Sequence, residues 1–187
     1  MRTCTFDSPF GPLLATATDL GVTELRFPPH EPRDGPPGRP TGVLADARAQ
    51  LSAWFAGDLT AFDLPLDLSA GTPFQQRVWA LLCTVPYGTT TSYGALARRL
   101  DSPGASRAVG AANGRNPVAL VVPCHRVVGS TGAITGYAGG LDRKRWLLDH
   151  ERSHSGATLL PADARDAADT SSTDPAARSW AGCPGPT

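Results

Sequence analysis

The segment Val118-Ala119-Leu120-Val121-Val122-Pro123-Cys124-His125-Arg126-Val127 is the most informative part of this 187-residue chain. Its first five residues form an apolar run, which predicts a buried element that carries Cys124 into the protein interior. A buried cysteine is commonly an inert packing residue. Here an imidazole and a guanidinium follow directly, and either group could favour the thiolate. These residues alone support a structural cysteine and a reactive cysteine about equally.

Charge is distributed unevenly around this segment, although the formal net charge of the chain is zero. Residues 1–71 carry five Arg against nine Asp and Glu, a net charge of −4. Residues 72–126 carry six Arg against Asp101 alone, a net charge of +5. DNA responds to local patches of charge rather than to the total. Residues 72–126 are therefore the candidate DNA-binding part, with modest affinity for phosphates.

The N-terminal third predicts a small α/β unit. Three β-rich runs predict strands, and the turn sequence at 7–12 joins the first two in a hairpin; the runs are residues 3–6, 13–18 and 21–27. Apolar residues recur at helical spacing from Val43 to Phe55, which predicts a helix that ends at Gly57. We expect this unit to be a scaffold.

Proline shapes the rest of the N-terminal third. Residues 28–40 contain six prolines and two glycines, which predicts a mobile loop. Residues 62–68 alternate between apolar and polar like a strand, but Pro65 lacks an N–H and confines that strand to the edge of a sheet.

The segment before Cys124 predicts short helices. Thr72, Pro73 and Gln75 form a capping signature that begins the first of them. Thr91 or Ser92 caps a second, at 93–100, and a break at 101–104 precedes a third, at 106–113. The last two form a helix-turn-helix pattern. Such pairs are also common in ordinary cores, so DNA binding depends on the surrounding motifs.

The end of the chain has a different composition. Residues 156–187 are rich in Ala, Asp, Ser, Thr and Pro with little apolar periodicity, which predicts a disordered tail. The expected organisation is therefore an α/β domain at 1–70, a mainly α domain at 71–155, and the tail. No apolar stretch approaches the roughly 20 residues that a membrane span needs, and the N-terminus lacks a signal-peptide core. We expect a cytoplasmic monomer without membrane contact.

Further motifs accompany the cysteine segment in a fixed order along the chain: Tyr87-Gly88, Thr91-Ser92-Tyr93-Gly94-Ala95-Leu96-Ala97, Arg107-Ala108-Val109-Gly110-Ala111-Ala112, Asn116-Pro117-Val118, Gly136-Tyr137-Ala138-Gly139-Gly140-Leu141 and Lys144-Arg145-Trp146-Leu147-Leu148-Asp149-His150-Glu151. Together they resemble the methylated-DNA–protein-cysteine methyltransferases, or 6-O-alkylguanine-DNA alkyltransferases. The resemblance runs continuously from about Thr72 to Glu151 and more loosely through the N-terminal third. It implies direct-reversal DNA repair. An alkyl group passes from the 6-oxygen of guanine, or the 4-oxygen of thymine, in double-stranded DNA to Cys124, and the protein is consumed.

The resemblance also implies catalytic roles. Cys124 is the nucleophile, because a soft thiolate suits displacement at carbon. His125 takes its proton through a bridging water, since neighbouring side chains of an extended chain point to opposite faces. Glu151 orients His125 as the third member of a triad. Tyr93 hydrogen-bonds the leaving guanine, although an aromatic residue here could equally pack on the core. Asn116 ties the recognition helix to the cysteine loop.

The remaining implied residues contact DNA or shape the pocket. Arg107 enters the minor groove and fills the stack that the flipped base vacates, with Tyr93 nearby. Small residues keep this helix thin: Ala108, Gly110 and Ala111. Arg126 supports the cysteine segment. The substrate pocket is expected to be lined by Tyr137, Ala138, Gly139, Gly140 and Val127.

No metal and no cofactor are expected. Some relatives bind zinc in the N-terminal domain, but Thr18 and Thr23 stand at the corresponding positions here. Cys4 and His30 alone cannot complete a four-ligand site.

Two other functions compete with alkyl transfer. One is a helix-turn-helix sensor of alkylated DNA without transfer activity, which retention of Cys124 argues against. The other is a Cys/His hydrolase, which usually needs a histidine remote in sequence and an oxyanion hole.

Overall fold

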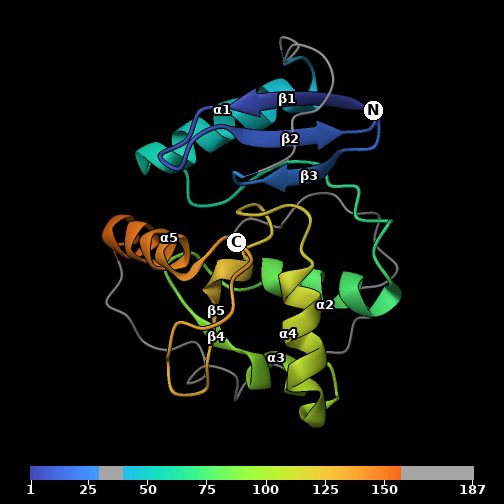
Figure 1. Cartoon of the computed structure of the whole chain (residues 1–187), viewed down its shortest axis with the longest axis vertical. Helices are drawn as coiled ribbons and strands as arrows, with labels where there is room; N and C mark the ends of the chain where they lie inside the picture. The colour runs from blue at the N-terminus through green and yellow to red at the C-terminus, as the bar shows by residue number, and fades with distance from the viewer. Residues whose placement is uncertain (30–39, 157–187) are drawn as a thin grey trace.

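A three-stranded antiparallel sheet covered by one helix forms the N-terminal part of the chain (Figure 1). The strands β1 (Arg2–Phe6), β2 (Leu13–Ala17) and β3 (Val22–Arg26) pair in that order. Helix α1 (Val43–Ala56) packs against the central strand β2, all of whose residues are buried. Gly57 ends α1 with a φ of 85°, a left-handed conformation that glycine adopts without strain. These elements confirm the predicted α/β unit.

This computed structural model describes residues 1–29 and 40–156. Most of the predicted proline-rich loop and nearly all of the predicted tail lie outside the described residues. The predicted edge strand at 62–68 is wrong as a strand, because its pairing with β3 is limited to one bridge between Val22 and Leu66. The N–H of Val22 donates to Pro65 O at 2.8 Å and the N–H of Asp67 to Val22 O at 3.0 Å. Pro65 has no N–H with which to extend the ladder.

The second half is mainly helical. Helix α2 (Pro73–Cys83) begins with the predicted capping box, in which Thr72 and Gln75 exchange side-chain and backbone hydrogen bonds. Helix α3 (Tyr93–Arg99) is capped by Ser92, whose hydroxyl accepts from Ala95 N at 3.1 Å. A short 3-10 helix, η1 (Pro103–Ala105), leads into α4 (Ser106–Gly114). The predicted helix-turn-helix is confirmed.

Four elements around Cys124 were not predicted. A 3-10 turn, η2 (Cys124–Arg126), holds the cysteine, so an extended chain is the wrong description there. The two-residue strand β4 (Thr91–Ser92) pairs in parallel with β5 (Val127–Val128). Helix α5 (Leu141–His154) packs beside η2. Through these contacts the start of α3 and the face of α5 meet at the cysteine.

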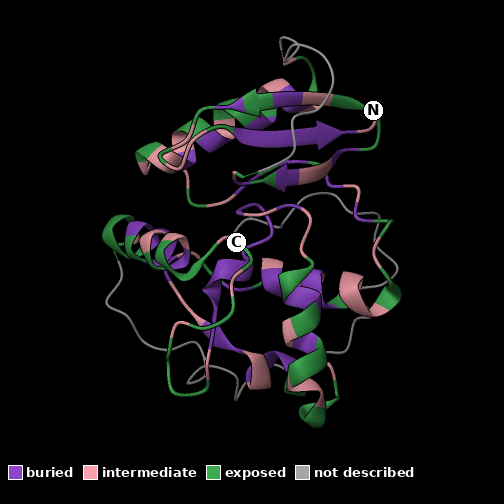
Figure 2. Ribbon diagram, viewed as in Figure 1, coloured by how far each residue is buried: buried purple, intermediate pink, exposed green. Residues whose placement is uncertain are grey.

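Several contacts join the two halves. Backbone bonds extend β3 toward the cysteine segment: the N–H of Leu25 donates to Pro117 O at 2.9 Å, and the N–H of Ala119 donates to Leu25 O at 3.1 Å. On the other side, His150 Nε2 lies 2.8 Å from Trp54 O, and the two rings are 4.7 Å apart. Figure 2 shows buried residues along β2 and through β4 and β5. One continuous core therefore fixes the N-terminal half against the region of Cys124.

Candidate active site

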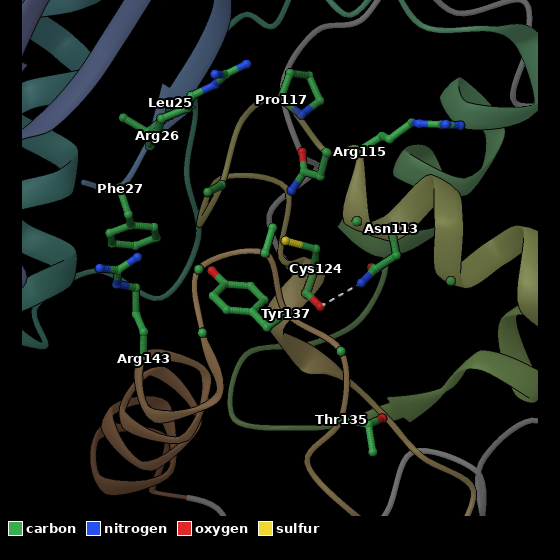
Figure 3. Close-up of a pocket in the computed structure, with 18 of the residues that line it drawn as sticks. Leu25, Arg26, Phe27, Asn113, Arg115, Pro117, Cys124, Thr135, Tyr137 and Arg143 are labelled. Carbon is green, nitrogen blue, oxygen red and sulfur yellow. Dashed lines mark hydrogen bonds between the residues drawn. The ribbon is translucent and has the colours of Figure 1, made fainter. Parts of the chain in front are cut away.

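A cleft of about 990 Å³ lies where the two halves meet, with Cys124 in its wall (Figure 3). The lining comes from the end of β3, from Tyr93 and α4, from the loop before Cys124, and from the loop that leads into α5. Its residues include Phe27, Pro28, Pro29, Tyr93, Gly110, Asn113, Arg115, Asn116, Ala119, Cys124, Thr135, Tyr137, Ala138, Gly139, Gly140 and Arg143. Of the five predicted pocket residues, only Val127 is absent from this lining.

The Cys124 thiol is buried, and only 6% of the residue is exposed. The preceding segment turns sharply, with Leu120 at a φ of 71°, an uncommon conformation for a branched residue. Burial raises the pKa of the Cys124 thiol, while a hydrogen bond from Asn116 and the positive charge of Lys144 act in the opposite direction. A nearby base is therefore needed to form the thiolate.

His125, which follows Cys124 in the chain, is completely buried. Its Nε2 lies 2.9 Å from Glu151 Oε1, whereas its Nδ1 has no hydrogen-bond partner among the described residues. Burial lowers the pKa of His125, against the carboxylate of Glu151, which raises it. The ring is thus neutral at neutral pH, and Nε2–H donates to Glu151. This tautomer leaves the Nδ1 lone pair available as a base.

Glu151 is the most heavily bonded side chain of the site. Besides His125, it accepts from Arg126 Nε at 3.0 Å and Arg126 Nη2 at 2.9 Å, and from the backbone N–H of Gly88 at 3.0 Å. Burial alone would raise the pKa of Glu151, but His125 and Arg126 overcome it and lower that pKa to about 2. Glu151 is therefore an anion throughout the physiological pH range.

Arg126 faces away from the cleft toward Glu151. Its Nη1 donates to Val85 O at 2.5 Å, and its guanidinium lies over the Tyr87 ring at 5.7 Å. These contacts fix the carboxylate and the turn after Cys124, which is a supporting position rather than a reacting one.

Tyr93 and the loop before α5 form the opposite wall. Tyr93 is the first residue of α3, and its hydroxyl donates to Gly136 O at 3.2 Å. Burial, followed by the charge of Cys124, raises the pKa of Tyr93, so the phenol keeps its proton. A Cβ on Gly139 would lie 2.7 Å from the Tyr137 ring, and glycine there allows the ring to pack against the backbone.

Lys144 is a site residue that the sequence analysis missed. It is fully buried, and its Nζ donates to Val127 O and, at 2.6 Å, to Thr135 O. Burial lowers the pKa of Lys144 to about 8, against the charge of Cys124. The sequence signal was helical spacing, because Lys144 shares a face with the buried Leu147, Leu148 and Glu151.

Two asparagines brace the cysteine loop, and only one was predicted. Asn116 Nδ2 donates to Val122 O at 2.8 Å, and Asn116 Oδ1 accepts from Val118 N at 3.0 Å, so its bonds stay within the loop. A side-chain link from α4 is made by Asn113, whose Nδ2 donates to Cys124 O at 3.4 Å (Figure 3). The bond from the helix to the cysteine turn thus comes from Asn113, and the tying role expected of Asn116 stays a prediction.

The predicted DNA-binding residues lie on α4. Arg107, Ala108 and Ala111 are exposed, whereas Gly110 faces the cleft, where a Cβ would lie 3.7 Å from the Tyr93 ring. Arg98 and Arg99 of α3 are also exposed. Helix α4 therefore presents Arg107 to solvent on one side and lines the cleft of Cys124 through Gly110 and Asn113.

Residues 1–29 and 40–156 lack two other kinds of site. No helix there has the length and apolarity to cross a membrane. The same residues contain no cluster of three or more His, Cys, Asp or Glu side chains arranged to hold a metal ion.

Comparison with known proteins gives consistent matches over both halves. Residues 1–68 match the family profile described as "6-O-methylguanine DNA methyltransferase, ribonuclease-like domain", and residues 73–153 match "6-O-methylguanine DNA methyltransferase, DNA binding domain". A methylated-DNA–protein-cysteine methyltransferase of Mycobacterium tuberculosis is 51% identical over 161 residues, which cover 85% of this chain and 97% of the relative. The corresponding protein of Methanosarcina acetivorans is 44% identical over 151 residues, which cover 79% of this chain and 96% of that protein.

A solved structure agrees with these matches. The crystal structure of Mycobacterium tuberculosis OGT in complex with DNA superposes with a TM-score of 0.75 at 48% identity, over 88% of this chain and 98% of that chain. The fold, the two profiles and the relatives lead to the same result. The chain belongs to the 6-O-methylguanine DNA methyltransferase family.

Proposed function

We propose that this protein repairs DNA by transferring a methyl or other alkyl group from the 6-oxygen of guanine to Cys124. One observation carries the proposal, namely that Cys124 lines a cleft and is followed by a histidine that can act as a base. Among the described residues, Nδ1 of His125 has no hydrogen-bond partner, while Nε2 of the same ring is bonded to Glu151. In the reaction the S–C bond forms as the C–O bond to guanine breaks, and the guanine receives a proton. The thioether has no route back to a thiol, so each molecule acts once.

The thiolate forms through His125. Its Nδ1 makes no direct hydrogen bond to the cysteine within the described structure, so a water molecule between the two groups relays the proton. The imidazolium that results is stabilised by Glu151, which stays anionic. The positive charge of Lys144 favours the thiolate from a second direction.

The leaving guanine is stabilised by Tyr93. An anionic purine is a poor leaving group, and a phenol that retains its proton can hydrogen-bond a ring nitrogen as charge develops. The Tyr93 hydroxyl bonds to Gly136 O in the loop that carries Tyr137, and a flat base can stack on the Tyr137 ring. Ala138, Gly139 and Gly140 line the same wall.

DNA binds through α4. The target base is inaccessible in a stacked duplex, so it must be flipped out, which costs a few kcal/mol. Arg107 enters the minor groove and replaces the flipped base, because a planar cation can stack and hydrogen-bond at once. The exposed Ala108 and Ala111 beside it allow close approach to the groove. The DNA complex of the M. tuberculosis relative supports DNA as the partner.

The proposed organisation has two domains and one compartment. The N-terminal domain covers residues 1–70 and the DNA-binding domain covers 71–155, a division that the separate matches at 1–68 and 73–153 support. Because the substrate is DNA and the nucleophile is a free thiol, we place the reaction in the reducing cytoplasm.

Intact-mass measurement tests this function. After incubation with duplex DNA that contains 6-O-methylguanine, the protein should gain one methyl group, and peptide mapping should place it on Cys124. Cys124→Ser should gain nothing while still binding the damaged duplex. Cys4→Ala is the matched control, because burial raises the pKa of this core thiol to about 11 and it should be dispensable. A sensor or hydrolase would leave the wild-type mass unchanged.

A further inference from the structure

Arg143, in the first turn of α5, joins the helix to the N-terminal half. Its guanidinium lies 4.6 Å from the centre of the Phe27 ring and 5.2 Å from that of Phe10. The two rings contact each other edge to face at 5.5 Å. Arg143 Nη2 also donates to Pro28 O at 3.1 Å. Arg143 therefore holds the segment after β3 by stacking on Phe27 and by a hydrogen bond to Pro28, a combination that lysine cannot reproduce. We call this set of contacts the Arg143 clasp.

The clasped segment is part of the cleft. Phe27, Pro28 and Pro29 line the same cavity as Cys124, and Arg143 lines it with them. In Figure 3, Phe27 and Arg143 lie on one side of the Tyr137 ring and Cys124 lies on the other. The N-terminal half thus supplies one wall of the pocket in addition to its expected role as a scaffold.

Tyr137 is held between these groups. Its hydroxyl is buried and has no hydrogen-bond partner among the residues that the structure describes. Burial, followed by the charge of Cys124, raises the pKa of Tyr137 well above its ordinary value, while the positive charge of Arg143 acts in the opposite direction. A Cβ on Gly139 would lie 3.1 Å from Arg143 Nη1, so Arg143 also packs on the backbone of the pocket loop.

We propose that Arg143 is a specificity-determining residue that limits the size of the alkyl group accepted by Cys124. By clasping Phe27 and Pro28 to α5, it fixes the gap between the Phe27–Pro28–Pro29 wall and the Tyr137 ring. A methyl group is too small to reach across that gap, and we infer that a larger benzyl group would extend into it. This inference rests on the proposed function, and it assigns Arg143 no contact with the reacting atoms.

The test compares two alkyl groups in the same duplex. Single-turnover rate constants are measured for 6-O-methylguanine and 6-O-benzylguanine with wild type, Arg143→Leu and Arg145→Leu. Arg145 is the matched control, since it is exposed on the same helix and paired with Asp142. The ratio of benzyl to methyl transfer should rise about tenfold in Arg143→Leu, the scale on which pocket contacts discriminate small apolar groups, and stay constant in the control.

A second variant keeps the test decisive if Arg143→Leu folds poorly. Phe27→Leu leaves the sequence of α5 unchanged, removes the ring on which Arg143 stacks, and should raise the same ratio. Equal loss of both rates, or an unchanged ratio in folded Arg143→Leu or Phe27→Leu, would overturn the inference and leave a purely structural clasp. Failure of the proposed function looks different, because the wild type would then transfer neither group.

Discussion

Replacement of Glu151 by Gln removes one charge from a fully buried cluster while keeping nearly the same shape. The pKa of Glu151 is lowered from its ordinary value of 4.5 to about 2 by His125 and Arg126, in spite of burial. Each pKa unit corresponds to about 1.4 kcal/mol, so the charged carboxylate contributes on the order of 3 kcal/mol to folding. The variant also leaves the Arg126 guanidinium buried without its counter-ion, which typically costs about 3–5 kcal/mol.

The sign of the pH dependence follows from the direction of the shift. A carboxyl group with a lowered pKa in the folded state contributes its full stabilisation above its unfolded pKa of about 4.5 and loses it as the pH falls toward 2. Wild-type protein should therefore lose stability steeply between about pH 5 and pH 2. Glu151→Gln should start from a lower stability at neutral pH and show a shallower acid limb, because its amide does not titrate.

Urea unfolding at a series of pH values measures both effects. Asp149→Asn is the control on the same helix, since this half-exposed carboxylate pairs with Arg152 at the surface and should change stability by less than about 1 kcal/mol. Acid limbs of equal slope for wild type and Glu151→Gln would refute the assignment of Glu151 as the buried anion of the site.

Three further predictions concern DNA binding, the buried Lys144 and the methylated product. Arg107→Ala should slow repair of duplex far more than of single strands, because only a duplex must be unstacked; equal losses in single-turnover assays would indicate a folding defect. Lys144→Met should shift the pH profile of transfer to higher pH by removing a cation that lowers the pKa of Cys124, and an unshifted profile would argue against this role. Methylated protein should be less stable by about 1–3 kcal/mol, through overpacking near the Asn116 and Asn113 contacts, and an unchanged or higher melting temperature would contradict this.

The sequence predicted best what depends on neighbouring residues. The capping box of Thr72 and Gln75 and the left-handed cap at Gly57 are local, so residue type and spacing suffice to find them. The helix-turn-helix followed from caps and breaks in the same way. The strand predicted at 62–68 is wrong, because a strand also needs a neighbouring strand to pair with. Here Pro65 lacks an N–H, and pairing with β3 is limited to the bridge between Val22 and Leu66.

The site was predictable only in part. The resemblance to the family identified Cys124, His125 and Glu151. It did not predict the 3-10 turn that holds Cys124 and His125. That turn lies between Leu120, which has a positive φ, and strand β5, which pairs with the sequence-distant β4. Helical spacing puts Lys144 on the buried face of α5, but its hydrogen-bond partners could not be predicted, because they are backbone carbonyls on two other segments. Every residue has a backbone carbonyl, so the sequence does not indicate which carbonyls will accept these hydrogen bonds.

The backbone pairing of Leu25 with Pro117 and Ala119 has a consequence for exchange of parts between relatives. Strand β3 leads into the pocket residue Phe27, and its Leu25 is hydrogen-bonded to the loop before Cys124. The pocket therefore spans the boundary between the two matched domains. A chimera that joins the first domain of one relative to the second domain of another therefore inherits a hybrid pocket. Its choice of alkyl group would follow neither parent, even when both halves fold.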